Sequence, residues 1–186
     1  MGYSMNGENK IQMARAFAAG AHGAIKQVRK YTGEPYIVHP AAVAAIVEAV
    51  PTHTWQMLCV AWLHDTVEDT SVTVDMIRDL FGDEVAAGVE FLTNVPREEG
   101  NRAARLEMNL AKLERAPDWV KTVKVADLMD NTKTIVKYDP KFAVLYLKEK
   151  KRTLKVLKGA DRVLRLMCLE QLCQGQDELD SARVAS

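Results

Sequence analysis

The stretch Ala61-Trp-Leu-His-Asp-Thr-Val-Glu-Asp-Thr70 places four ionisable side chains at the end of an otherwise apolar helical segment. In a continuous helix, His64 and Glu68 share one face, and Asp65 and Asp69 share the neighbouring face. Burying these groups is costly unless a partner neutralises them, and a divalent cation would do so. The negative end of the helix dipole also favours a cation there. The alternative is a solvated helix end that carries a surface cluster of salt bridges.

The composition predicts a globular protein with a balanced charge. The chain has 186 residues, of which 48% are apolar, and its 25 Lys and Arg residues equal its 25 Asp and Glu residues. A non-specific nucleic-acid binder would need excess basic charge, so this balance argues against that class. It still allows a local basic pocket for one small phosphorylated ligand.

The cysteines and the apolar runs indicate a cytoplasmic protein. Three cysteines without a Cys-x-x-Cys pair form neither a regular disulfide framework nor a thiolate zinc site, so we expect reduced, structural thiols. The N-terminus has no signal pattern, and the apolar runs are too short to cross a bilayer. We therefore expect a cytoplasmic location and no membrane or nucleic-acid polymer as partner.

Apolar residues at three- and four-residue spacing predict an all-α fold of about eight helices in a single domain spanning residues 1–186. We expect Thr52 or Thr54 to cap the helix of the quoted stretch, Thr73 to cap a short helix that Gly82 ends, and the tail after Gln174 to fray. The expected helices cover about residues 11–21, 40–50, 55–70, 73–81, 83–92, 102–115 and 117–131, and a final long helix runs from about Pro140 past Leu166.

Two further residues are candidates to complete a metal site with His64 and Asp65. His39 directly precedes Pro40, close to a helix start, and Asp127 lies inside a largely apolar helical segment. A carboxylate in such a helix requires a partner. Taken alone, His39 could be a structural histidine. Asp127 could simply pair with Lys124, which shares its helix face.

The four candidate ligands and the adjacent acidic residues suit hydrolytic chemistry. Two imidazoles and two carboxylates suit Mn²⁺ or Fe²⁺, and Zn²⁺ also fits. Such an ion lowers the pKa of a bound water. Glu68 and Asp69 are then placed to orient or deprotonate that water, or to protonate a leaving group.

Basic side chains near His39 are candidates for binding phosphate oxygens. Lys26, Arg29 and Lys30 precede Tyr36, which could hydrogen-bond or stack. Each could equally belong to a solvated face. Tyr146 could reach a base or sugar, or lie in the core.

Other polar residues are given structural or surface roles. We expect residues 148–152 to form a solvated basic face, and His22 and His53 to be structural or surface residues.

Three motifs together resemble one known family. Arg29-Lys-Tyr-Thr-Gly-Glu-Pro-Tyr-Ile-Val-His-Pro40, Leu63-His-Asp-Thr-Val-Glu-Asp-Thr70 and Lys124-Val-Ala-Asp127 are similar to the hydrolase domain of RelA/SpoT homologues. The resemblance runs from about Ala14 to Leu157. That domain belongs to the HD superfamily, and its stand-alone members are the small alarmone hydrolases.

The resemblance implies an all-helical HD fold with a single Mn²⁺ and removal of the 3′-pyrophosphate of guanosine tetra- or pentaphosphate (ppGpp or pppGpp), which gives GDP or GTP. It implies His39, His64, Asp65 and Asp127 as metal ligands and Glu68 and Asp69 as the catalytic pair. The implied substrate contacts are Arg29, Lys30, Tyr36, Asn131 and Tyr146, and we add Lys26 and Lys124 as candidate substrate contacts.

Two departures from the family pattern bear on the nucleotide. Leu128 stands where the family has a basic residue, and Asp130 where it has an aromatic one. The family's Gly-Gln after the early histidine is also absent. Two alternatives therefore stay open: an HD phosphohydrolase acting on a deoxynucleoside monophosphate or the 2′-phosphate of NADPH, and a non-enzymatic helical module.

Overall fold

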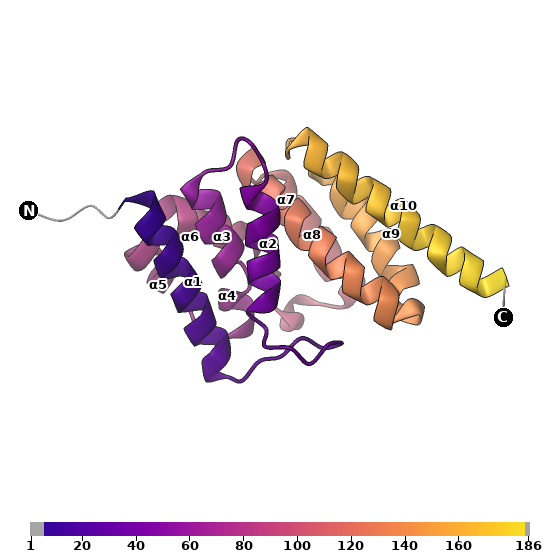
Figure 1. Cartoon of the computed structure of the whole chain (residues 1–186), viewed down its shortest axis with the longest axis horizontal. Coiled ribbons are helices and arrows are strands. Elements are labelled where there is room, and N and C mark those ends of the chain that lie inside the picture. Colours follow the sequence, from indigo (N-terminus) through magenta and orange to yellow (C-terminus); the bar gives the residue numbers. More distant parts are fainter. Residues whose placement is uncertain (1–5, 185–186) are drawn as a thin grey trace, which may run out of the picture. The chain divides into compact units, whose positions relative to one another are not determined.

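The computed structural model describes residues 6–184, and within this range the regular secondary structure is entirely helical (Figure 1). An isolated antiparallel bridge between Val28 and Pro35 accompanies the helices. The all-α prediction is confirmed. No helix among residues 6–184 is both long and apolar enough to cross a membrane.

The chain forms two compact units, with the boundary between Asn94 and Val95. The prediction of a single domain stays a prediction. The first unit contains α1 (Gly7–Ala24), α2 (Val38–Glu48), α3 (Trp55–Leu63), α4 (Thr66–Asp69), α5 (Val74–Phe81) and α6 (Asp83–Leu92). The second contains the 3₁₀ turn η1 (Arg97–Glu99) and α7 (Arg102–Glu114), α8 (Asp118–Tyr138), α9 (Pro140–Val156) and α10 (Arg162–Val184).

Helix α3 is the centre of the first unit. It packs against α1, α2 and α6, and six of its nine residues are buried. A helix covered on several sides has no polar face, which explains its apolar sequence. The end of α3 is therefore held firmly, and the residues that follow it start from a fixed position.

The quoted stretch forms two helices where one was predicted. Helix α3 ends at Leu63, and the single turn α4 begins at Thr66, so His64 and Asp65 lie at the junction. The hydroxyl of Thr66 donates to the carbonyl oxygen of Leu63 at 2.7 Å, which satisfies a backbone group that the break exposes. The backbone N–H of Asp69 donates to the carbonyl oxygen of Asp65 at 3.0 Å, so these two residues lie one helical turn apart as predicted. The predicted shared face of His64 and Glu68 stays a prediction.

The second unit is built on mutual packing of α8, α9 and α10. The predicted final long helix is two helices, because the chain turns between Leu157 and Asp161 before α10 begins. The predicted fraying after Gln174 is also wrong within the described range. Helix α10 continues to Val184, and Leu179 is buried there.

Side-chain caps begin helices where the sequence indicated them. Thr54 accepts a hydrogen bond from the backbone N–H of Met57 at the start of α3, and Thr73 does the same for α5. Gly82 separates α5 from α6 with φ 94° and ψ 170°, a region that only glycine occupies readily. The turn between these helices therefore depends on the absence of a side chain at position 82.

Replacing Gly82 by alanine is expected to destabilise the protein, by about 1–3 kcal/mol, because alanine is strained at this φ. Gly20→Ala is the matched control. It lies on an exposed face inside α1 with space for a methyl group, and should stabilise by about 0.5–1 kcal/mol. Urea unfolding of both variants measures the two effects. Equal stabilities would contradict the conformational argument.

Candidate metal centre and acidic pair

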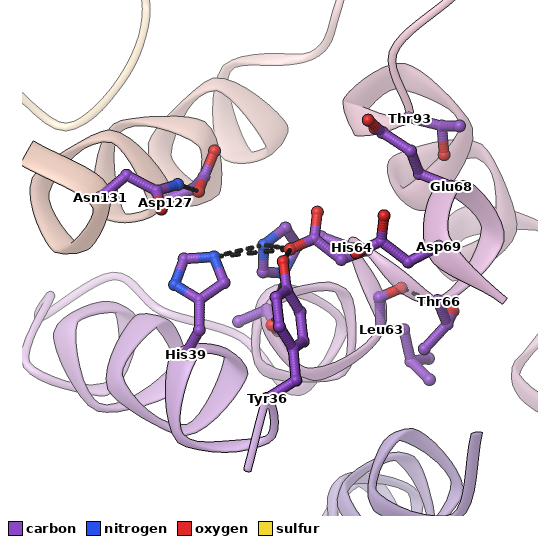
Figure 2. Close-up of polar contacts among 12 residues, drawn as sticks. Tyr36, His39, Leu63, His64, Thr66, Glu68, Asp69, Thr93, Asp127 and Asn131 are labelled. Carbon is purple, nitrogen blue, oxygen red and sulfur yellow. Dashed lines mark hydrogen bonds and ion pairs between the residues drawn. The ribbon is translucent and has the colours of Figure 1, made fainter. Parts of the chain in front are cut away.

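Three potential ligand atoms converge in the first unit. His64 Nε2 lies 3.2 Å from His39 Nε2 and 3.1 Å from Asp65 Oδ2, and His39 Nε2 lies 3.5 Å from the same oxygen (Figure 2). Both imidazoles are almost completely buried, whereas the side chain of Asp65 is 20% exposed. The structure therefore brings together three of the four predicted ligands within this unit.

The hydrogen bonds of His64 fix which nitrogen can bind an ion. Its Nδ1 lies 2.9 Å from the carbonyl oxygen of Ala61. A carbonyl only accepts, so Nδ1 carries the proton and the lone pair of Nε2 faces His39 and Asp65. A backbone carbonyl behind a histidine is the usual arrangement around a metal ligand. The donor set of two imidazoles and a carboxylate fits a divalent cation.

Tyr36 supports this group. It precedes α2 in sequence, and its hydroxyl donates to Asp65 Oδ2 at 2.6 Å. Its ring centroid lies 4.7 Å from that of His22 and 5.8 Å from that of His39. Predicted as a substrate contact, Tyr36 thus orients a candidate metal ligand.

The two acidic side chains of α4 are held by different partners. Asp69 Oδ2 accepts from Gln27 Nε2 at 2.9 Å. The carboxylate of Glu68 accepts from the backbone N–H of Asn94 at 2.9 Å and from its side-chain amide at 3.2 Å. Both carboxylates are exposed, so each is accessible to a reactant while its orientation is fixed from behind.

The predicted phosphate-binding side chains lie on the turn and loop between α1 and α2. The loop closes through Arg29 N–H to the carbonyl oxygen of Glu34 at 2.8 Å, with Gly33 at φ 72°. Lys26 and Lys30 are exposed, and Arg29 is half-buried. Lys30 Nζ donates to the hydroxyl of Tyr31 at 3.1 Å.

In the second unit, Asp127 is buried on α8 with both carboxylate oxygens engaged. Lys124 Nζ donates to Oδ2 at 2.8 Å, and Asn131 Nδ2 donates to Oδ1 at 2.6 Å. The expected pairing along one helix face is therefore present.

Tyr146 and Lys150 lie one turn apart on α9. The side chain of Tyr146 is buried, and that of Lys150 is half-buried. The Tyr146 hydroxyl lies 3.3 Å from Thr132 Oγ1, and burial raises the pKa of this tyrosine. Lys150 Nζ lies 4.9 Å from the centre of the Tyr146 ring. The expectation of a solvated face at residues 148–152 is wrong at Lys150, which is only partly exposed. Burial, together with the positive charge of Lys124, lowers the pKa of Lys150 to about 8.

Three residues with contacts at these sites were not singled out from the sequence: Gln27, Asn94 and Lys150. Asn94 follows a helix end and Lys150 lies within a run of basic residues, which are ordinary surface patterns. His22 was given a structural or surface role, and the structure places it 2.6 Å from Gln27. In the sequence, His22 lies seven residues before Arg29, and this spacing does not indicate a contact between His22 and Gln27.

Comparisons with known proteins agree on one family. Residues 14–157 match the HD domain family. A guanosine-3′,5′-bis(diphosphate) 3′-pyrophosphohydrolase of Aquifex aeolicus is 38% identical over 132 residues, which are 68% of this chain and 18% of the relative. A probable GTP pyrophosphokinase of Mycobacterium leprae is 36% identical over 65% of this chain and 15% of the relative. The chain thus spans less than a fifth of these curated relatives.

Solved structures show the same fold. One, described as a metazoan ortholog of SpoT that hydrolyzes ppGpp and plays a role in starvation responses, matches with a TM-score of 0.79 and 25% identity. That match covers 94% of this chain and 98% of the other. A crystal structure of lmo0812 from Listeria monocytogenes matches with a TM-score of 0.63 and 25% identity over 77% of this chain and 96% of the other.

Removing the Tyr36 hydroxyl should weaken metal binding, because Asp65 loses the donor that orients it. We expect Tyr36→Phe to lower Mn²⁺ affinity about tenfold in calorimetric titrations. Tyr138→Phe, on an exposed tyrosine at the end of α8, serves as the control and should leave affinity unchanged. Equal affinities of both variants would refute the supporting role.

Lys150 should destabilise the protein at neutral pH. Its pKa is lower in the folded state than in the unfolded chain, so the unfolded chain binds more protons between about pH 8 and 10.5, and stability rises with pH there. Lys150→Met should therefore be more stable at pH 7, by about 1–3 kcal/mol, and the gain should vanish near pH 10.5. Urea unfolding across this range tests it against Lys151→Met, an exposed neighbour. A pH-independent difference would argue against the burial effect.

Proposed function

Because the chain belongs to the HD domain family, we propose that it is a metal-dependent phosphohydrolase that removes pyrophosphate from the 3′ position of ppGpp or pppGpp. The products would be GDP or GTP and pyrophosphate. The observation that carries the proposal is the convergence of His39 Nε2, His64 Nε2 and Asp65 Oδ2 within 3.5 Å beside an acidic pair. The Aquifex aeolicus relative and the SpoT-like structure support the choice of substrate.

We propose Asp127 of the second unit as the fourth ligand and Mn²⁺ as the metal. Asp127 is buried within an apolar stretch of α8, and its carboxylate is positioned by Lys124 and Asn131. The set of imidazole and carboxylate donors without thiolate favours Mn²⁺ or Fe²⁺, and Zn²⁺ also fits. A cation bound there supplies Lewis-acid chemistry, lowering the pKa of water and neutralising phosphoryl charge.

In this proposal Glu68 and Asp69 move protons. Water attacking the phosphorus on the 3′ oxygen must lose a proton, and the leaving 3′ oxygen must gain one. Two exposed carboxylates held by separate partners can divide these tasks. Their fixed orientation reduces the entropy lost on reaching the transition state.

The remaining polar side chains would bind the nucleotide. The exposed Lys26 and Lys30 and the half-buried Arg29 offer cations for the phosphate groups. We also propose that Tyr36, Lys124, Asn131 and Tyr146 bind the substrate, in addition to the contacts that they make within the protein. Tyr36 orients Asp65, Lys124 and Asn131 orient Asp127, and the Tyr146 hydroxyl lies against Thr132.

One observation favours a different nucleotide as the second candidate. Leu128, where relatives are expected to carry a basic residue, is fully buried and offers no charge to a substrate. A substrate with fewer phosphates, such as a deoxynucleoside monophosphate or NADPH at its 2′-phosphate, needs fewer cations. The reaction class is the same in both candidates.

A nucleotide panel with Mn²⁺ distinguishes these candidates. We expect pyrophosphate release from ppGpp, separated by ion-exchange chromatography, and its loss on treatment with a chelator. Asp65→Asn should reduce the rate on the order of 100-fold or more, because the cation contributes several kcal/mol to catalysis. Asp75→Asn, on an exposed aspartate of α5, is the control and should keep the wild-type rate.

The other outcomes are equally specific. Release of inorganic phosphate from another nucleotide, with ppGpp intact, would replace the leading candidate by the second. A chain that binds no Mn²⁺ and hydrolyses no member of the panel would be a non-enzymatic helical module.

A further inference from the structure

A chain of two hydrogen bonds connects a buried histidine to one carboxylate of the acidic pair. His22, on the last turns of α1, is 1% exposed, and its Nδ1 lies 2.6 Å from Gln27 Oε1. Gln27 Nε2 donates to Asp69 Oδ2 at 2.9 Å. All three residues belong to the first unit.

The chemistry of these groups fixes the direction of both bonds. A carboxylate accepts only, so the amide nitrogen of Gln27 faces Asp69 and its carbonyl oxygen faces His22. A carbonyl also only accepts, so the proton of His22 lies on Nδ1. The ring of His22 therefore holds the Gln27 amide in the one orientation that offers an N–H to Asp69.

The backbone independently holds Gln27 against His22. Helix α1 ends in a Schellman motif, in which Gln27 N–H donates to the carbonyl oxygen of His22 at 3.1 Å and Lys26 N–H to that of Gly23 at 3.0 Å. Lys26 takes the left-handed position of this motif with φ 51°, a conformation that is strained for a lysine. Tyr36 N–H then donates to the carbonyl oxygen of Gln27 at 3.0 Å.

Packing beside the Tyr36 ring accounts for an aromatic side chain at position 22, but not for a buried polar ring nitrogen. The Nε2 of His22 is buried without a hydrogen-bond partner among the described residues, which an apolar side chain of similar size would avoid. The hydrogen bond that the structure gives its ring goes to Gln27. The ring thus gains its polar contact only by orienting that amide.

We propose that Gln27 and His22 are positioning residues that hold Asp69 in its reactive orientation. This inference rests on the proposed hydrolase function. Glu68 is held separately by Asn94, so the His22–Gln27 pair should act on Asp69 alone. The substrate does not touch either residue in this scheme, so the effect should appear in kcat and leave KM unchanged.

Gln27→Glu separates orientation from folding. The new carboxylate still accepts from His22 Nδ1–H, but it cannot donate to Asp69 and repels it. We expect kcat to fall about tenfold with unchanged Mn²⁺ content. Gln12→Glu, which breaks an exposed amide–carboxylate bond to Glu8 on α1, is the matched control and should keep the wild-type kcat.

Two variants of His22 give a second readout that a structural role would not produce. In His22→Asn the side-chain amide nitrogen takes the place of Nδ1 and still donates to Gln27, whereas His22→Leu fills the space without a donor. Positioning predicts a higher kcat for the asparagine variant even where the leucine variant melts at a higher temperature. A kcat that follows melting temperature would overturn the proposal.

The results test the proposed hydrolase function and the positioning role separately. A wild-type protein that hydrolyses ppGpp while Gln27→Glu keeps full kcat overturns the positioning role and leaves the proposed function intact. A wild-type protein that hydrolyses no nucleotide overturns both.

Discussion

The candidate site is built around the junction between α3 and α4, where His64 and Asp65 lie between Leu63 and Thr66. His64 and Asp65 keep right-handed helical dihedral angles at this junction. At the break, His64 and Asp65 approach within 3.1 Å and both face His39. The buried helix α3 fixes the position of this junction, and the Thr66 hydroxyl satisfies the carbonyl group that the break exposes.

Polar side chains behind the site compensate for its concentration of charge. Tyr36 donates to Asp65, Gln27 to Asp69, and Asn94 to Glu68. Each donor comes from a segment outside α3 and α4, so the site is built by packing of distant parts of the chain. Charge-assisted hydrogen bonds of this kind are stronger than neutral ones, and they restrict the carboxylates to few orientations.

The sequence was sufficient to predict most helices and the residue types of the metal centre. Periodicity and caps located α5 to α8, and the chemistry of His64 and Asp65 indicated a cation. The break after Leu63 escaped prediction because residues 64–69 have ordinary helical character, and His64 and Asp65 themselves keep helical dihedral angles. The second break, before α10, was missed because apolar periodicity continues across it. Gln27 and Lys150 were missed because burial and hydrogen-bond direction depend on the folded backbone.

The separate anchoring of the acidic pair has a consequence for how the site can be altered. Gln27 lies three residues after the end of α1, and Asn94 is the last residue of the first unit, after α6. A substitution in one of these segments therefore changes the hydrogen bonding of one carboxylate and leaves that of the other unchanged. The orientations of the two carboxylates of α4 can therefore change independently of each other. A different leaving group needs a change at one carboxylate only, and the other carboxylate and the metal ligands stay as they are.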